Sequence, residues 1–157
     1  QADEKAIRVP SLQIKTANSF LALKATVDWS VTEQNQDGVL NGQFMAEIGK
    51  ADLFKLIPDM PQEFIQSFPA APLQVRIGVD GNLSDLKLTT CQVKIPDCFR
   101  MEIDGTVKNV LDSLSREGVI NLNSDFYKMG FLSSLTGGLI IPSGMNIHGK
   151  AGMKGND

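Results

Sequence analysis

The residues that most often perform catalysis are sparse in this sequence. His148 is the only histidine, so a serine or cysteine nucleophile would have to use it as the base. It stands in the stretch NIHGK, out of phase with Ile147 and Gly149, and has no serine or cysteine in a recognisable nucleophile context. The alternation predicts that His148 is a solvent-facing strand residue.

Metal and carboxylate chemistry find equally little support. Cys91 and Cys98 have a C-x6-C spacing that matches no common metal motif, and two cysteines are too few for a disulfide framework. We expect two unpaired thiols, one in a strand and one in a turn. The aspartates lack the D-x-D spacing of a calcium loop. A glycosidase-like carboxylate pair stays open, although nothing singles one out. We expect no enzyme activity, no metal and no cofactor.

Two similar stretches end in Gly-Asn: IGVDGN, from Ile77 to Asn82, and KAGMKGN, from Lys150 to Asn156. A phosphate-binding loop would need a G-x-G-x-x-G or G-x-x-x-x-G-K-[ST] pattern that opens into a helix. The first stretch has a different spacing and is followed by another strand-like run. Because Gly and Asn both tolerate positive φ, we interpret the two stretches as β-turns that close a repeated unit.

The composition is typical of one folded domain. The 157 residues are 42% hydrophobic and 21% charged. The net charge of −3 and the pI near 5.1 argue against nucleic acid as a partner. No apolar run approaches the roughly 20 residues that span a bilayer. Because the chain begins with Gln1 rather than Met, we expect a piece of a longer protein whose membrane anchor, if it has one, lies outside this segment.

An internal repeat organises the sequence. Residues 7–20 (IRVPSLQIKTANSF) align without gaps with residues 86–99 (LKLTTCQVKIPDCF) at an offset of 79, which matches Phe20 with Phe99. Both copies shift their apolar phase by one residue, at Pro10-Ser11 and at Thr89-Thr90. Such a shift in a period-2 pattern predicts a β-bulge in each copy.

The repeat continues through a second strand-like segment. Residues 37–48 (DGVLNGQFMAEI) match residues 117–128 (EGVINLNSDFYK) at an offset of 80. In both copies the even positions are mostly apolar and the odd positions largely polar, which is typical of a strand with one buried face. Residues 50–68 then predict two short helical segments, and residues 128–138 predict a shorter one that ends at Gly137-Gly138. A final alternating strand closes each copy.

These observations predict a mainly β fold: an elongated, curved antiparallel sheet whose apolar face is capped by short helices. The chain would be a single β-rich domain, residues 1–157, made of two tandem units at about 7–82 and 86–156. A three-residue turn at 96–98 places Cys98 at its tip and Cys91 inside. It also predicts three cross-strand pairs on one face: Ile95 with Phe99, Val93 with Met101, and Cys91 with Ile103.

Large apolar residues could line a ligand cavity or form the core, and the core is the commoner outcome. The set comprises Trp29, Phe44, Met45, Phe54, Met60, Phe64, Phe68, Phe126, Met129 and Phe131. Two short helices are, however, small covers for one face of an extended sheet. An uncovered apolar patch of more than a few hundred Å² usually marks a ligand or partner surface. The residues expected to face inward are Leu40, Phe44, Leu73, Val75, Ile77, Val93, Ile95, Phe99, Met101, Ile103, Ile120, Leu122 and Phe126.

The order of these elements resembles the AsmA-like proteins, including the TamB type, of Gram-negative envelopes. The stretches that carry the resemblance are GKADLFKLIP, APLQVRIGVDGNLSDLKL and MEIDGTVKNV. The resemblance implies a periplasmic β groove with an apolar interior, tethered to the inner membrane. It also implies a part in phospholipid transport or outer-membrane assembly, without catalytic residues. The thirteen inward-facing residues would then contact phospholipid acyl chains. Neighbouring repeats of the same chain or envelope proteins would be the protein partners. The alternative is a structural β-repeat interaction module without lipid cargo, and an enzyme with an unrecognised carboxylate site is a further one.

Overall fold

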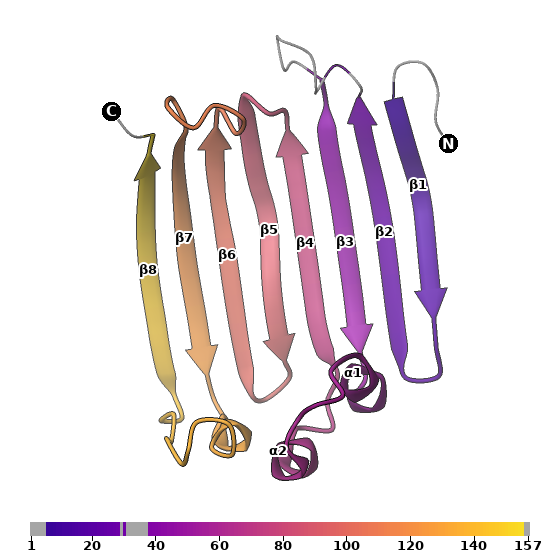
Figure 1. Ribbon diagram of the computed structural model, residues 1–157, viewed down its shortest axis with the longest axis vertical. Coiled ribbons are helices and arrows are strands. Elements are labelled where there is room, and N and C mark those ends of the chain that lie inside the picture. Colours follow the sequence, from indigo (N-terminus) through magenta and orange to yellow (C-terminus); the bar gives the residue numbers. More distant parts are fainter. Residues whose placement is uncertain (1–5, 29, 31–37, 156–157) are drawn as a thin grey trace.

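Eight strands form one open, curved antiparallel sheet in which spatial order follows chain order, from β1 to β8 (Figure 1). The computed structural model describes residues 6–28, 30 and 38–155. This arrangement confirms the mainly β fold class predicted from the alternating sequence pattern. The strands are β1 (Ala6–Lys15), β2 (Ser19–Asp28), β3 (Leu40–Ile48), β4 (Leu73–Gly81), β5 (Asp85–Ile95), β6 (Phe99–Lys108), β7 (Glu117–Phe126) and β8 (Met145–Lys154).

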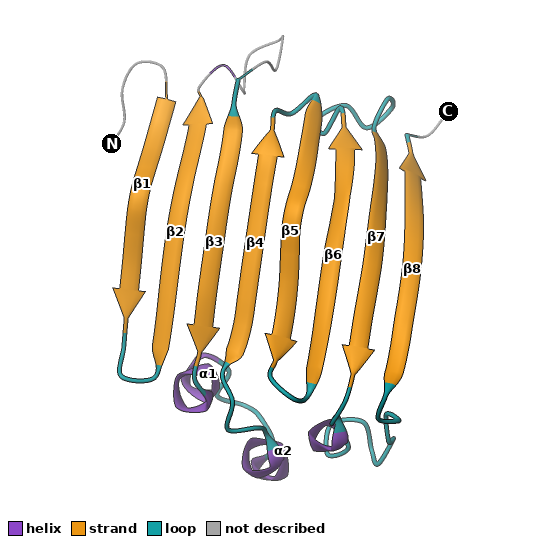
Figure 2. Cartoon of the chain, turned by 180° about the vertical axis from the view of Figure 1, so that it is seen from behind, coloured by secondary structure: helices purple, strands orange, loops and turns teal. Residues whose placement is uncertain are grey.

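Within residues 38–155, three short helical elements interrupt the strands. The α-helices α1 (Lys50–Leu56) and α2 (Gln62–Ser67) lie between β3 and β4, and the 3-10 helix η2 (Gly130–Leu132) lies between β7 and β8. Figure 2 shows all three at the end of the sheet where β3 and β7 finish. The helical segment predicted for residues 128–138 is thus shorter than expected. Residues 133–138 form turns, and Gly137 and Gly138, with φ angles of 66° and 94°, end the segment where the stop was predicted. No helix of the described residues is long and apolar enough to cross a membrane.

The order of elements is the same in both halves of the chain. Three strands, a helical segment and a fourth strand make up β1–β4, and the same order recurs in β5–β8. The pairing of β4 with β5 joins the two halves into one continuous sheet. Both predicted bulges are confirmed, because the register shifts between Val9 and Leu12 in β1 and between Leu88 and Cys91 in β5.

The turn between β4 and β5 shows why Gly-Asn stands there. Gly81 has a φ of +127°, and a Cβ at this position would lie 2.1 Å from the carbonyl oxygen of Asp85. The side-chain Oδ1 of Asn82 accepts hydrogen bonds from the backbone N–H groups of Ser84 (3.0 Å) and Asp85 (2.7 Å). The structure therefore supports a tight turn here. In the second Gly-Asn stretch, Asn156 lies outside the described residues.

The predicted register of the second hairpin is correct, but its tip is not exposed. Val93 pairs with Met101 and Ile95 with Phe99, as the three-residue turn required. Cys98, expected at the tip, is only 6% exposed. Its carbonyl oxygen accepts hydrogen bonds from the backbone N–H groups of Tyr127 (2.7 Å) and Lys128 (3.1 Å). The chain leaving β7 therefore covers the tip. Cys91 and Cys98 are both free thiols.

Two of the predicted correspondences between the halves are wrong. The first error comes from turn length, because Phe20 pairs with Lys15 whereas Phe99 pairs with Ile95. The first hairpin therefore has four residues between its last paired positions and the second has three. Because side chains alternate between faces, this one-residue difference places Phe20 and Phe99 on opposite faces of the sheet.

The second error is a slip of two residues between β3 and β7. The offset of 80 matches Phe44 with Ser124. When cross-strand partners are followed from β3 to β7, however, Phe44 corresponds to Leu122, an offset of 78. Ala46 then corresponds to Ser124, and both are buried, at 1% and 4% exposed. A two-residue slip leaves every side chain on its original face. The predicted faces are therefore correct although the alignment is not.

The buried core lies at the helical end of the sheet and belongs to both halves. It consists of Leu53, Phe64, Phe68, Ile95, Cys98, Met129 and Phe131, with Phe54, Met60, Phe99 and Phe126 packed against it. The aromatic rings meet mostly edge to face, for example Phe68 with Phe131 at a centroid distance of 5.3 Å. Most of the large apolar residues singled out in the sequence therefore belong to the core, as expected, rather than to a ligand cavity. Phe44 and Met45 lie in the sheet away from this cluster, and Trp29 lies outside the described residues.

Candidate functional site: one apolar face of the sheet

Rows of mostly apolar residues cross all eight strands on one face, interrupted by glycines and by Ser124. Directly opposite residues of paired strands point to the same face, so cross-strand partners can be followed from β1 to β8. One row is Leu12, Leu23, Phe44, Ile77, Cys91, Ile103, Leu122 and Gly149. The next row toward the helices is Ile14, Leu21, Ala46, Val75, Val93, Met101, Ser124 and Ile147.

Two further rows lie on the other side of the bulges. They are Val9, Ala25, Gly42, Val79, Leu88, Gly105, Ile120 and Ala151, and then Ile7, Val27, Leu40, Gly81, Leu86, Val107, Gly118 and Met153. We call these four rows the apolar face. They contain no charged residue. The bulges in β1 and β5 keep the apolar phase of each strand on this face despite the extra residue.

The helices cover only the end of this surface. A fifth row beside them includes Ile48, Leu73, Ile95, Phe99 and Phe126, which lie in or against the buried core. Farther from the helices large side chains are exposed. Ile14 on β1 is 53% exposed, Ile77 at the centre is 37% exposed, and Ile147 on β8 is 42% exposed.

The dimensions of the apolar face follow from sheet geometry. Seven strand spacings of about 4.8 Å give a width of about 34 Å, and three intervals of about 6.8 Å between the four rows give about 20 Å. The product, about 700 Å², is the outline area of the face and is comparable to the largest apolar patches that monomeric soluble proteins expose, which are often functional. This face is therefore the principal candidate for binding.

The opposite face is mostly polar, and several of its side chains hydrogen-bond across neighbouring strands. Amide side chains donate to carboxylates on neighbouring strands, as in Asn41 to Asp80 (2.8 Å) and Gln92 to Glu102 (2.7 Å). The hydrogen bond from Arg100, followed by that from Gln92, lowers the pKa of the Glu102 carboxyl. These cross-strand pairs stabilise the sheet and explain the shift without invoking catalysis.

His148 also belongs to this polar face. It is exposed, as predicted, and its Nδ1 lies 2.7 Å from Oδ1 of Asn123 on the neighbouring strand. No cluster of three or more potential metal ligands occurs among the described residues.

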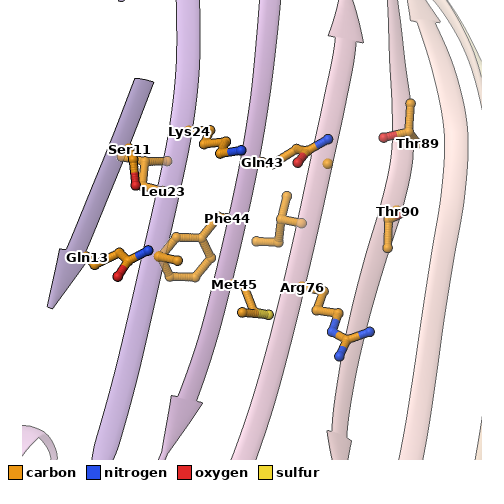
Figure 3. Close-up of a pocket in the computed structure, with 13 residues that line it drawn as sticks. Ser11, Gln13, Leu23, Lys24, Gln43, Phe44, Met45, Arg76, Thr89 and Thr90 are labelled. Atoms are coloured by element: carbon orange, nitrogen blue, oxygen red, sulfur yellow. The ribbon is translucent and has the colours of Figure 1, made fainter. Parts of the chain in front are cut away.

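A shallow hollow of about 380 Å³ lies on the polar face around β2–β4 (Figure 3). It forms where Ala22 and Gly78 present little or no side chain between longer neighbours. Its polar lining residues are Ser11, Gln13, Lys24, Gln43, Arg76, Thr89 and Thr90. The described residues that line the hollow include hydroxyl groups but no histidine or carboxylate.

All thirteen residues predicted to face inward lie on the same side of the sheet. Leu73, Phe99 and Phe126 pack against the helical core, and Ile95 is only 2% exposed. These four are thus parts of the cap contact. The remaining nine belong to the four open rows: Leu40, Phe44, Val75, Ile77, Val93, Met101, Ile103, Ile120 and Leu122.

The sequence-based prediction omitted the outer strands of the same surface. Leu12 and Ile14 on β1, Leu21 and Leu23 on β2, and Ile147 on β8 continue the two central rows. The alternation in residues 7–14 was visible in the sequence and could have extended the prediction to β1. For β8 the signal was weaker, because Gly149 interrupts it.

The fold and its exposed face define the class of protein: a single-layer antiparallel β-sheet with one apolar and one polar surface. Comparison of the chain with family models, with curated proteins and with solved structures gave no match.

Proposed function

We propose that this chain is a non-enzymatic segment of an AsmA-like envelope protein and that its apolar face holds phospholipid acyl chains. The observation that carries the proposal is that four mostly apolar rows without a charged residue cross all eight strands, with helices covering only one end. Acyl chains suit this surface because it offers a long apolar track without charged residues. Burial of apolar area contributes about 25 cal/mol per Å² removed from water.

The cellular setting follows from the sequence resemblance and is part of the same proposal. The segment works in the periplasm of a Gram-negative bacterium, in a protein tethered to the inner membrane, and contributes to phospholipid transport or outer-membrane assembly. The polar face meets water, and its cross-strand hydrogen bonds support that assignment.

Two neighbouring residues provide a matched test of which face binds lipid. Ile120 and Val119 are adjacent on β7, both β-branched and similarly exposed, at 41% and 38%. Ile120 pairs with Gly105 on the apolar face, whereas Val119 pairs with Thr106 on the polar face. The substitutions Ile120→Asp and Val119→Asp therefore place the same charge at similar depth on opposite surfaces.

The assay is binding of a phospholipid with a fluorescent acyl chain, together with native mass spectrometry of protein expressed in bacteria. We expect wild type to carry phospholipid. Ile120→Asp should weaken binding about fivefold or more, which corresponds to about 1 kcal/mol, and Val119→Asp should bind like wild type. Equal effects of the two variants, or wild-type protein that neither binds the probe nor carries lipid, would contradict the proposal.

The second candidate is a structural repeat module without lipid cargo. The outer edges of β1 and β8 favour it, because neither has a strand partner among the described residues and such edges readily bind other strands. Lipid-free protein that associates through its edges would support this candidate over the first.

A further inference from the structure

The two ends of the sheet lack a neighbouring strand among the described residues. β1 pairs only with β2 and β8 only with β7, so the outer edge of each strand has no strand partner in this part of the chain. Large apolar side chains are exposed beside these edges: Leu12 and Ile14 on β1, and Ile147 on β8. Such edges are templates for pairing with another chain.

The middle of the sheet shows what fits such an edge. β4, the last strand of the first half, pairs antiparallel with β5, the first strand of the second half. In the order of elements β8 corresponds to β4, and β1 corresponds to β5. We propose that β8 of one molecule pairs with β1 of a second copy of this chain and reproduces the β4–β5 junction between molecules.

Strand direction allows this pairing without rotating the second copy. Strands alternate in direction along the sheet, so β8 runs like β4 and β1 runs like β5 (Figure 1). A second copy placed beside β8 in the same orientation therefore presents β1 antiparallel to it. The contact is head to tail, so each end of the pair again presents a strand that has no strand partner among the described residues. Association should therefore continue into longer chains as the concentration rises.

The β4–β5 pairs fix the register of the intermolecular contact. Val75 faces Val93 in that junction, and the corresponding residues are Ile147 of one copy and Ile14 of the other. The next apolar pairs would be Gly149 with Leu12 and Ala151 with Val9. In this register the rows of the apolar face continue from one molecule into the next without a change of face.

One position of β8 departs from the template. Gly78 of β4 lies beside the bulge of β5, and a Cβ there would come within 2.5 Å of Oγ1 of Thr89. Lys150 occupies the corresponding position in β8, and Pro10 occupies the bulge position in β1. Lysine and proline on sheet edges weaken edge pairing. Removing the side chain with Lys150→Gly should therefore strengthen the association.

Disulfide cross-linking between two single-cysteine proteins tests the register directly. Cys91 and Cys98 are first replaced by alanine, and Ile14→Cys and Ile147→Cys are introduced into separate chains that are then mixed. Directly opposite residues of antiparallel strands have Cα atoms about 4.5–5.5 Å apart, within the range of about 4.4–6.8 Å that a disulfide requires. Within one molecule, residues 14 and 147 lie about 34 Å apart across the sheet. A chain that carries both cysteines could therefore form this disulfide only with a second molecule.

The matched control is His148→Cys mixed with Ile14→Cys. His148 is adjacent to Ile147 and exposed, but its side chain is on the polar face. We expect a cross-linked dimer when Ile14→Cys is mixed with Ile147→Cys, and little when it is mixed with His148→Cys. Adding Lys150→Gly should increase the yield of the first dimer about fivefold or more, which corresponds to about 1 kcal/mol. Circular dichroism verifies that each variant is folded.

Two results would overturn the proposal. One is equal cross-linking of residue 14 to 147 and to 148, which indicates random collision. The other is a single monomeric species in sedimentation velocity at every soluble concentration, with and without Lys150→Gly. The proposal does not depend on lipid binding, because cross-linking and sedimentation report association between molecules and need no lipid.

Discussion

The phenylalanine cluster at the helical end is predicted to hold the two halves of the sheet together. Phe68, at the end of α2, is 7% exposed and its ring lies 5.2–5.6 Å from the rings of Phe54, Phe64 and Phe131. Phe131 belongs to the second half of the chain. The substitution Phe68→Ala removes a buried ring at the place where, among the described residues, α2 and η2 pack together.

The expected cost follows from burial. Truncating a buried phenylalanine to alanine lowers the free energy of unfolding by about 3–5 kcal/mol. Ile14→Ala is the comparison, because Ile14 is 53% exposed. Complete burial of an isoleucine contributes about 1.5–3 kcal/mol, so loss of a half-exposed side chain should cost about 1 kcal/mol. Phe68→Ala should thus lower the free energy of unfolding about three times as much as Ile14→Ala, or more.

Urea denaturation followed by far-ultraviolet circular dichroism measures both variants. A double-mutant cycle of Phe68→Ala with Phe131→Ala then isolates the contact between the halves, for which an edge-to-face ring pair suggests a coupling of about 0.5–1.5 kcal/mol. A cost of Phe68→Ala no greater than that of Ile14→Ala, or full additivity of the two cap substitutions, would contradict this prediction.

Three further predictions concern single residues. Gly81→Ala should lower the free energy of unfolding by about 1–3 kcal/mol, because Gly81 has a positive φ and an added Cβ would contact Asp85. The control is Gly152→Ala, whose Cβ meets open space and should change the free energy of unfolding by less than about 0.5 kcal/mol in urea titrations. Hydrogen bonds from Thr16 and then Ser19 lower the pKa of Asp52 in the folded state. Wild type should therefore be more stable than Asp52→Asn at pH 7, and this difference should disappear as the pH falls below about 4 and through the lowered folded-state pKa. Thermal denaturation between pH 7 and pH 2 measures the difference, and a constant difference would contradict the prediction. Burial raises the pKa of the Cys98 thiol, so a thiol reagent at pH 8 should label Cys91 first and Cys98 only on unfolding, and equal labelling rates would argue against the buried hairpin tip.

The sequence predicted which side chains point to the candidate face, but not which of them the helices cover. Alternation assigned Leu40, Ile77 and Ile103 to one face, and the cross-strand pairs place all thirteen predicted residues on it. Ile95 has the same alternation as Val93, yet it is 2% exposed and covered by the cap. Only the packing of the helices separates the two, because periodicity describes which way a side chain points and not what lies above it.

The repeat was also predictable only in part. Shared phase shifts at Pro10-Ser11 and Thr89-Thr90 revealed both bulges, since an extra residue leaves a local mark in a period-2 pattern. Turn length leaves no such mark. The four-residue turn that moves Phe20 to the opposite face from Phe99, and the two-residue slip between β3 and β7, became visible only in the pairing of the strands.

The one-sided antiparallel sheet was predictable from the amino-acid sequence, because strand alternation and turn chemistry are local properties of the chain. The division of the apolar side into core and surface, in contrast, depends on tertiary packing. The helices pack on the row that contains Ile48 and Ile95, since all three are short and the segments that carry them follow β3 and β7, which end at the same edge of the sheet. Which rows are covered and which stay exposed is decided by contacts between residues far apart in the chain, and no local sequence pattern indicates those contacts.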